Sequence, residues 1–243
     1  MLEAAGFQVE LPRRSLCCGW PLYDYGFLGL AKRLLHQILD ELRPAIAAGV
    51  PVFRDELLNL FPQDADARRL SAQMFLLSEF LDREAKDFEL PRLRRTALMH
   101  GHCHHKAIMR MAAEQRILRR VGLDAREPED GCCGMAGAFG FEREHYGVSI
   151  KAGERALLPA VHAANPDELI IAGGFSCREQ IEQTTGRHAL HLAEVLQLAL
   201  RQHETGAGRE RDACDERCPC RRRPRAALAG AMAAVVWRKR RHE

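Results

Sequence analysis

Hydrophobic residues in the second half of the chain fall into short blocks with two different spacings. Residues 95–101 and 167–174 are apolar runs that end in glycine, a pattern typical of buried strands. Residues 106–122 and 143–161 carry apolar side chains at near-helical spacing, and Gly122 is expected to cap the first of these helices. Because strands alternate with helices, the pattern predicts an α/β fold with mainly parallel strands.

Landmarks recur at a constant offset of 115 residues, which indicates an internal duplication. The tripeptide Cys-Cys-Gly at 17–19 falls on the same tripeptide at 132–134, and a proline and a Leu-x-Glu-x-Leu motif follow in the same order. We therefore predict two duplicated units, a first repeat over residues 1–94 and a second repeat over residues 95–203.

The first repeat is predicted to be incomplete. A counterpart of the strand at 95–101 would precede Met1, so the chain is expected to start inside a domain. The repeat also has no counterpart of Cys177 and retains only Cys17 and Cys18. Two thiolates are rarely enough for a metal cluster. This candidate second metal site is therefore expected to be empty or to be completed by a group outside this chain.

The net charge of +3 does not favour nucleic acid as a partner, and the basic residues are concentrated near the C-terminus. Residues 204–243 are rich in Arg, Pro and Ala, which predicts a disordered, Arg-rich tail. Its Cys214, Cys218 and Cys220 do not have the spacing of a zinc ribbon. The apolar run at 226–237 is 12 residues long, so no membrane span is expected.

The chain has nine cysteines, and its first residues lack the apolar stretch of a secretory signal peptide. Cysteines in such a chain are typical of metal-binding or redox thiolates rather than of disulfides. We therefore expect a cytoplasmic protein, either free or peripherally attached at the inner face of the membrane.

Four cysteines of the second repeat follow predicted strands or turns: Cys103, Cys132, Cys133 and Cys177. The carboxyl ends of parallel strands meet at one edge of a sheet, so these thiols are expected to converge although 28 and 43 residues separate their segments. Thiolates are soft, anionic donors for iron and zinc, which makes these four the predicted metal ligands. The alternative is that they are small buried residues of the core.

The residues around these cysteines suggest supporting roles. His102 and His104 flank Cys103, and we expect them to act on the metal site through hydrogen bonds rather than as ligands. Gly134 is expected to let the backbone approach a bulky inorganic group. His105 is expected to be solvated at the start of the next helix. A Cys–His nucleophile built on Cys103 is a weaker alternative, because no oxyanion-stabilising constellation is visible.

The motifs HGHCHHKA (100–107), GCCGMAGAFGFEREHYG (131–147) and AGGFSCREQI (172–181) resemble the cysteine-rich (CCG) domain family. This domain occurs in the B subunit of heterodisulfide reductase, in the iron–sulfur subunits of glycolate oxidase and anaerobic glycerol-3-phosphate dehydrogenase, and in the C-terminal part of FAD-linked oxidases fused to iron–sulfur modules. The resemblance covers residues 1–203 and is strongest in the second repeat.

The resemblance implies that Cys103, Cys132, Cys133 and Cys177 ligate an iron–sulfur cluster, in the first place [4Fe–4S], with zinc as the alternative. The family has a further cysteine three residues before the last one, where this chain has Gly174. That departure disfavours a cluster held by five thiolates.

The resemblance also implies a function, which is iron–sulfur electron transfer within a flavin-linked oxidoreductase that oxidises a 2-hydroxy acid or a similar substrate. The chain shows neither a flavin-binding segment nor a ferredoxin-like cysteine run, so FAD is expected on a flavoprotein dehydrogenase partner and ferredoxin-type clusters on another module. The chain alone is not expected to be a complete enzyme. The alternatives are a zinc-stapled structural or interaction domain and a metal-free degenerate fragment.

Overall fold

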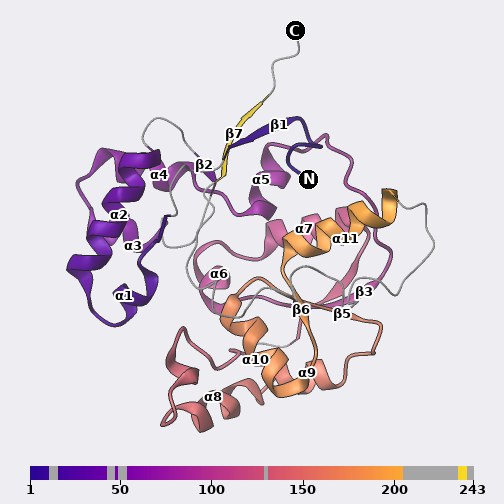
Figure 1. The fold of residues 1–243 in the computed structure, drawn as a ribbon. Helices are drawn as coiled ribbons and strands as arrows, with labels where there is room; N and C mark the ends of the chain where they lie inside the picture. The colour runs from indigo at the N-terminus through magenta and orange to yellow at the C-terminus, as the bar shows by residue number, and fades with distance from the viewer. Residues whose placement is uncertain (11–15, 43–46, 49–53, 129–130, 205–234, 240–243) are drawn as a thin grey trace. The chain divides into compact units, whose positions relative to one another are not determined.

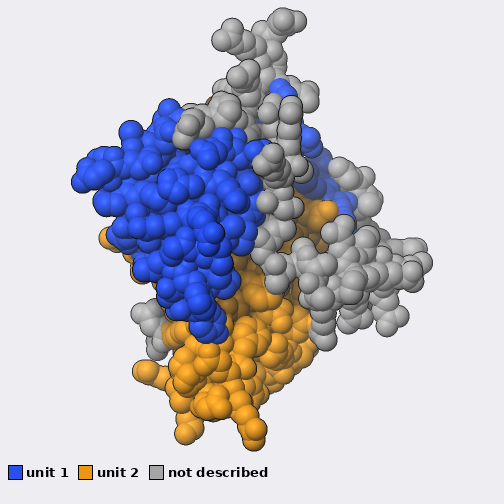
Figure 2. Space-filling model, turned by 60° about the vertical axis from the view of Figure 1, so that its left-hand side comes forward, with its two compact units in different colours: residues 1–75, 200–243 blue, residues 76–199 orange. Residues whose placement is uncertain are grey.

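The computed structural model describes residues 1–10, 16–42, 47–48, 54–128, 131–204 and 235–239. The chain separates into two compact units, which Figure 2 shows in different colours. One consists of residues 1–75 and 200–243, and the other of residues 76–199. The second unit contains the four cysteines predicted to bind metal.

A four-stranded sheet forms the centre of the second unit (Figure 1). All of its strand pairs are parallel and the strand order is β4-β3-β5-β6, which confirms the predicted α/β fold. The strands are β3 (Thr96–His100), β4 (Asp124–Arg126), β5 (Leu169–Ala172) and β6 (Ala189–Leu190). The apolar runs predicted as strands are β3 and β5, whose side chains are almost all buried because the sheet is covered on both faces.

Helices cover both faces of this sheet, with α7 and α11 on one side and α9 and α10 on the other (Figure 1). Right-handed crossovers between parallel strands produce this arrangement. The helices are α5 (Leu77–Arg83), α6 (Cys103–Ile108), α7 (Ala112–Val121), α8 (Tyr146–Gly153), α9 (Leu157–His162), α10 (Phe175–Thr185) and α11 (Leu192–Glu204), and a 3₁₀ turn, η2, spans Phe139–Phe141.

Helix α7 illustrates how the sequence sets these elements. Ile117, Leu118 and Val121 lie on one face at helical spacing and are fully buried. The helix ends at Gly122, which has a φ of 86°. A left-handed residue at this position is a common helix terminator and favours glycine, so the predicted cap is confirmed.

Each of the two long predicted helices is divided in the structure. The predicted helix at 106–122 becomes α6 and α7, because Arg110 has a φ of 63° and a left-handed residue cannot continue a right-handed helix. The predicted helix at 143–161 becomes α8 and α9. Pro159 stands in the first turn of α9, where its missing N–H has no helical partner to lose.

The cysteines lie at the edge of a continuous apolar core. Cys133 and Cys177 pack with Leu98 of β3 and Ile170 of β5, which line the sheet, and with helix residues such as Val161. The core therefore fixes the positions of the two inner sulfurs, because close-packed side chains leave little freedom to move.

The first unit contains short helices and a small antiparallel sheet. Its helices are α1 (Trp20–Asp24), α2 (Leu28–Leu42), α3 (Glu56–Leu60) and α4 (Ala65–Gln73). Its strands are β1 (Phe7–Glu10), β2 (Ala47–Ala48) and β7 (Val235–Lys239), in the order β1-β7-β2. Leu35 and Ile38 of α2 pack with Leu70 of α4 in its core.

Strand β7 comes from the region predicted as a disordered tail. It pairs antiparallel with β1 and with β2. Its sequence, VVWRK, has the β-branched and aromatic residues that favour strands. The remainder of the predicted tail, residues 205–234 and 240–243, lies outside the described residues, and so do Cys214, Cys218 and Cys220.

Candidate metal centre

The strand order brings the ends of β3 and β5 together. From β3 the chain crosses to β4 on one side and later to β5 on the other, so β3 and β5 flank the point where the winding direction changes. His100 of β3 pairs in register with Ala172 of β5. Ligand sites of open α/β sheets lie beyond the carboxyl ends of the strands at such a point. The segments that follow these two strands carry Cys103 and Cys177.

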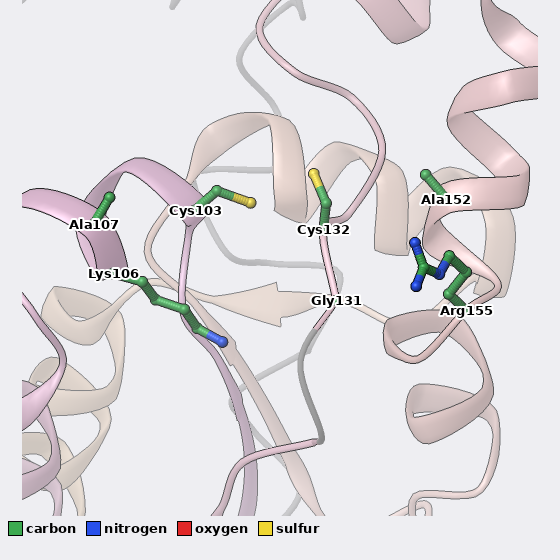
Figure 3. Close-up of a pocket in the computed structure, with 7 residues that line it drawn as sticks. All are labelled: Cys103, Lys106, Ala107, Gly131, Cys132, Ala152 and Arg155. Carbon is green, nitrogen blue, oxygen red and sulfur yellow. The ribbon is translucent and has the colours of Figure 1, made fainter.

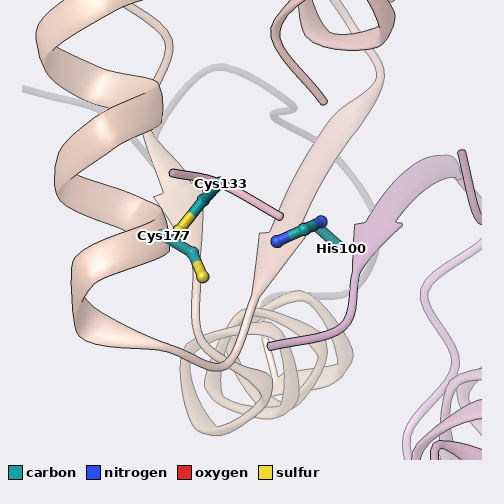
Figure 4. A group of neighbouring side chains, drawn as sticks. All are labelled: His100, Cys133 and Cys177. Atoms are coloured by element: carbon teal, nitrogen blue, oxygen red, sulfur yellow. The ribbon is translucent and has the colours of Figure 1, made fainter. Parts of the chain in front are cut away.

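Three donor side chains form an inner group in this place. One ligand atom from each of His100, Cys133 and Cys177 lies within 4.8 Å of the other two, and all three residues are buried. Figure 4 shows the imidazole of His100 facing the two cysteines across the site. The three residues come from the end of β3, the loop after β4 and the first turn of α10, so tertiary folding alone brings them together.

A tight turn places Cys133 in this group. Gly134 has a φ of 92°, a backbone conformation that favours glycine. Its N–H donates to the Sγ atom of Cys132 at 3.3 Å. A Cβ atom at position 134 would collide with the backbone carbonyl of Ser149 in α8. The glycine after the two cysteines is therefore required by both conformation and space.

The other two cysteines form an outer pair. Cys103 and Cys132 are exposed and line an open pocket of about 520 Å³. Figure 3 shows their sulfur atoms on neighbouring segments, with Lys106 below Cys103 and the guanidinium of Arg155 on the far side of Cys132. Lys106 also forms an ion pair with Glu127 at 2.9 Å. The two adjacent cysteines thus lie on different sides of the site: Cys133 belongs to the inner group and Cys132 lines the pocket.

A hydrogen bond between the two inner thiols moves their pKa values in opposite directions. The hydrogen bond from Cys177 is the main reason that the pKa of Cys133 is lowered, and His100 lowers it further, although burial acts in the opposite direction. The same hydrogen bond and burial raise the pKa of Cys177. These directions favour ionisation of Cys133 over that of Cys177, so Cys133 is the inner sulfur better suited to donate to a soft metal ion.

Charge couples the inner and outer cysteines. Burial raises the pKa of Cys103 to about 11, and the neighbouring Cys132 thiol and the charge of Cys133 add to this effect. The pKa of Cys177 is also raised by the charges of Cys103 and Cys132. Several thiols that cannot ionise together without a counter-charge are the arrangement that a metal cation stabilises.

The flanking histidines occupy different environments. His102 precedes α6 and is half-buried, and its burial lowers its pKa. Its ring lies against Gly174, where a Cβ atom would stand 2.6 Å from Cδ2 of His102 and 3.1 Å from Sγ of Cys177. His104 is half-buried on α6 and lies outside the inner group.

The prediction that His105 is solvated is wrong. His105 is only 8% exposed, and its Nδ1 lies 3.8 Å from an oxygen of Glu114, which is itself buried. Helix α7 packs over α6 at this point, and local sequence does not reveal that contact. Burial raises the pKa of Glu114 to about 7.

His100 is the donor that sequence reasoning missed. It is 2% exposed, and its Nε2 atom is buried without a hydrogen-bond partner among the described residues. The available signal was its place as the last residue of a predicted strand, three residues before Cys103. Sequence alone does not distinguish such a histidine from a solvated one.

The candidate second site of the first unit has only two thiols among the described residues. Cys17 and Cys18 are half-buried before α1, and Cys18 packs against the core of that unit. Burial raises the pKa of Cys18, which favours the neutral thiol. Within the described chain, no compact group of three metal-ligating side chains includes either cysteine.

The residues of the main site fit a soft metal centre. Two thiols and one imidazole meet in a buried group, two further thiols lie close enough for their charges to act on Cys177, and Nε2 of His100 has no partner among the described residues. Thiolate and neutral imidazole are the donors that iron and zinc prefer.

The fold and the site define a class of protein. It is a parallel α/β unit whose cysteines lie where the winding direction of the sheet changes. The chain belongs to the cysteine-rich (CCG) domain family, whose sequence profile matches residues 1–50 and 97–182. The predicted family is therefore confirmed, and the matched residues lie in both of the predicted repeats.

The curated relatives include two proteins with dehydrogenase names and a lactate utilization protein. The C subunit of the anaerobic glycerol-3-phosphate dehydrogenase of Escherichia coli (strain K12) is 28% identical over 213 residues, which cover 82% of this chain and 53% of that protein. The lactate utilization protein A of Bacillus licheniformis is 24% identical over 220 residues, 81% of this chain and 89% of that protein. The D-2-hydroxyglutarate dehydrogenase of Pseudomonas putida is 27% identical over 190 residues, 73% of this chain but 18% of that protein.

The chain spans about half the length of the glycerol-3-phosphate dehydrogenase subunits that it matches. No solved structure is significantly similar to it. In the described part of the chain, no helix has both the length and the apolar character needed to cross a membrane.

Proposed function

We propose that the second unit is an iron–sulfur electron-transfer module of a flavin-linked oxidoreductase, with Cys103, Cys132, Cys133 and Cys177 as the cluster ligands. The observation that carries the proposal is that Cys133 and Cys177 share one buried group although they come from separate segments, with Cys103 and Cys132 close enough for their charges to act on Cys177. Four thiolates are the usual ligands of a [4Fe–4S] cluster, which would supply one-electron transfer when bound.

The inner and outer cysteines have different tasks in this proposal. Cys133 and Cys177 hold the buried side, where the packed core excludes water. The N–H of Gly134 donates to the sulfur of Cys132, and such a hydrogen bond reduces the negative charge on that sulfur. Backbone N–H groups near a cluster sulfur are one of the means by which proteins set its potential.

The pocket beside Cys103 and Cys132 is the proposed route for electrons. These two cysteines are the exposed ones of the four, so a redox partner would come nearest to the centre on this side. Lys106 and Arg155 add positive charge around the pocket, which would attract an acidic partner surface or an anionic acceptor.

The names of the relatives support the wider setting. They include a dehydrogenase subunit, a lactate utilization protein and a 2-hydroxyglutarate dehydrogenase. We infer that this chain works with a flavoprotein dehydrogenase that carries FAD and with a ferredoxin-type module, in the oxidation of a 2-hydroxy acid or a similar alcohol. The flavin chemistry would take place on the partner.

A zinc-stapled structural domain is the second candidate. The close spacing of His100, Cys133 and Cys177, within 4.8 Å, supports it, because a single tetrahedral ion gathers its ligands more tightly than a cluster whose sulfurs bind different iron atoms. Zinc held there would fasten three remote segments without any redox activity.

Anaerobic purification followed by iron, sulfide and zinc analysis tests these functions. We expect iron, sulfide and broad visible absorption in the wild type, their loss in Cys133→Ser, and their retention in Cys18→Ser. Cys18 is the matched control because it occupies the equivalent Cys-Cys-Gly tripeptide of the first repeat. Stoichiometric zinc without iron would favour the second candidate, and metal-free wild-type protein would contradict both.

A further inference from the structure

We propose that His100 is a direct nitrogen ligand of the metal centre, beside Cys133 and Cys177. The inference rests on the proposed function only for its premise that a metal is bound at this site. His100 would replace one outer cysteine, Cys103 or Cys132, in the ligand set proposed above, since iron–sulfur clusters and zinc sites both accept imidazole in place of a thiolate.

Burial of His100 is the first support. The residue is 2% exposed, and Nε2 has no hydrogen-bond partner among the described residues. A buried polar atom that has lost its water and gained no partner destabilises a protein, and such atoms are rare in native structures. A metal bond at this nitrogen would remove that penalty.

Spacing is the second support. The three donor atoms of His100, Cys133 and Cys177 lie within 4.8 Å of one another. Metal–nitrogen and metal–sulfur bonds of about 2.0–2.3 Å place neighbouring ligands of one tetrahedral ion roughly 3–4 Å apart. Small side-chain rotations would bring the inner group to that spacing, and an outer cysteine, Cys103 or Cys132, would complete the four-ligand set.

Other histidines near the site do not have this placement. His102 turns its ring toward Gly174, and its half-buried position leaves it in contact with solvent. His104 lies on α6, outside the inner group. His100 is the histidine whose place at the end of β3 directs its ring toward the two buried cysteines (Figure 4).

A nitrogen ligand would change what the centre does. A neutral imidazole in place of a thiolate removes one negative charge, which makes reduction more favourable. His100 would therefore give this chain a centre of higher potential than an all-thiolate one.

X-ray absorption of the wild-type protein, purified anaerobically with its own metal, tests the ligand directly. We expect a nitrogen shell at about 2.0–2.1 Å in addition to sulfur at about 2.3 Å. Labelling with ¹⁵N-histidine, with pulsed electron paramagnetic resonance on the reduced cluster or on the Co²⁺-substituted site, should show a strongly coupled histidine nitrogen. These measurements need no variant, so misfolding cannot obscure them.

The variants His100→Ala and His102→Ala identify which histidine supplies the nitrogen ligand. We expect His100→Ala to remove the coupled nitrogen and to lower affinity for Zn²⁺ by about 100-fold or more, whereas His102→Ala keeps the nitrogen and loses less than about tenfold. A metal-loaded wild type with sulfur ligands only, or a nitrogen signal that survives His100→Ala, would overturn the inference and leave the proposed function intact. Wild-type protein that binds no metal would overturn the proposed function itself.

Discussion

Gly134 lies so close to the backbone carbonyl of Ser149 that no side chain fits between them. This contact locks the Cys132–Cys133 turn onto α8, and the positive φ of Gly134 keeps the turn tight. The position of the inner sulfur of Cys133 therefore depends on a residue that has no side chain of its own.

Gly134→Ala should destabilise the protein by roughly 3 kcal/mol, because the new methyl group meets a backbone atom and the residue keeps an unfavourable φ. Unfolding in urea, followed by circular dichroism, measures the loss. Gly147→Ala is the matched control, since that glycine of α8 has open space around it and a helical position, where alanine adds up to about 1 kcal/mol. Equal stabilities for the two variants would contradict the packing argument.

Position 174 tests how this chain departs from its family. The cysteine that the family places there would push its Cβ against the ring of His102, so Gly174→Cys should destabilise the protein by roughly 1–3 kcal/mol and reduce metal content. The double variant Gly174→Cys/His102→Ala should recover stability, because the ring that blocks the space is gone. Thermal unfolding and metal analysis of both variants, with His102→Ala alone as control, check this. A double variant no better than the single one would show that His102 is not the obstacle.

The raised pKa of Glu114 predicts that the stability of the protein depends on pH. Burial raises its pKa from 4.5 to about 7, so the folded state binds this proton more tightly than the unfolded state does. The group therefore lowers the free energy of unfolding as pH rises from about 4.5 to about 7, by up to about 3 kcal/mol. Glu114→Gln should be more stable than the wild type at pH 8 and about equal to it at pH 5. A stability difference that does not change with pH would contradict this expectation.

Two arginines of α7, Arg120 and Arg116, allow contacts with backbone carbonyl oxygens to be compared with a surface ion pair. The Arg120 guanidinium donates to the carbonyl oxygens of Leu81, Ala85, Lys86 and Phe88 at 2.8–3.3 Å, which ties the segment after α5 to α7. Arg120→Ala leaves these acceptors unpaired and should cost about 2–3 kcal/mol.

The exposed ion pair of Arg116 with Asp82 serves as the control, and Arg116→Ala should destabilise the protein much less than Arg120→Ala does, because solvent screens a surface pair. Chemical unfolding of both variants gives the comparison. A larger loss for Arg116→Ala would mean that the surface pair, not the carbonyl contacts, holds this segment.

Local patterns in the sequence were sufficient for the elements of the second unit. Continuous apolar runs predicted β3 and β5, and Gly122 predicted the end of α7, because each of these signals acts within a few residues. The strand-end positions of Cys103, Cys132, Cys133 and Cys177 were also visible, since they follow from the order of elements along the chain.

The sequence could not show which donors meet in space. The inward place of Cys133, the outward place of Cys132 and the burial of His100 depend on which strands are neighbours and on what packs above them. The contact of His105 with Glu114 joins two consecutive helices, and it depends on how the chain bends between them. The sequence by itself thus determined the elements and the family, whereas the tertiary structure decided the composition of the site, because proximity between remote segments is set by sheet order and core packing rather than by local propensity.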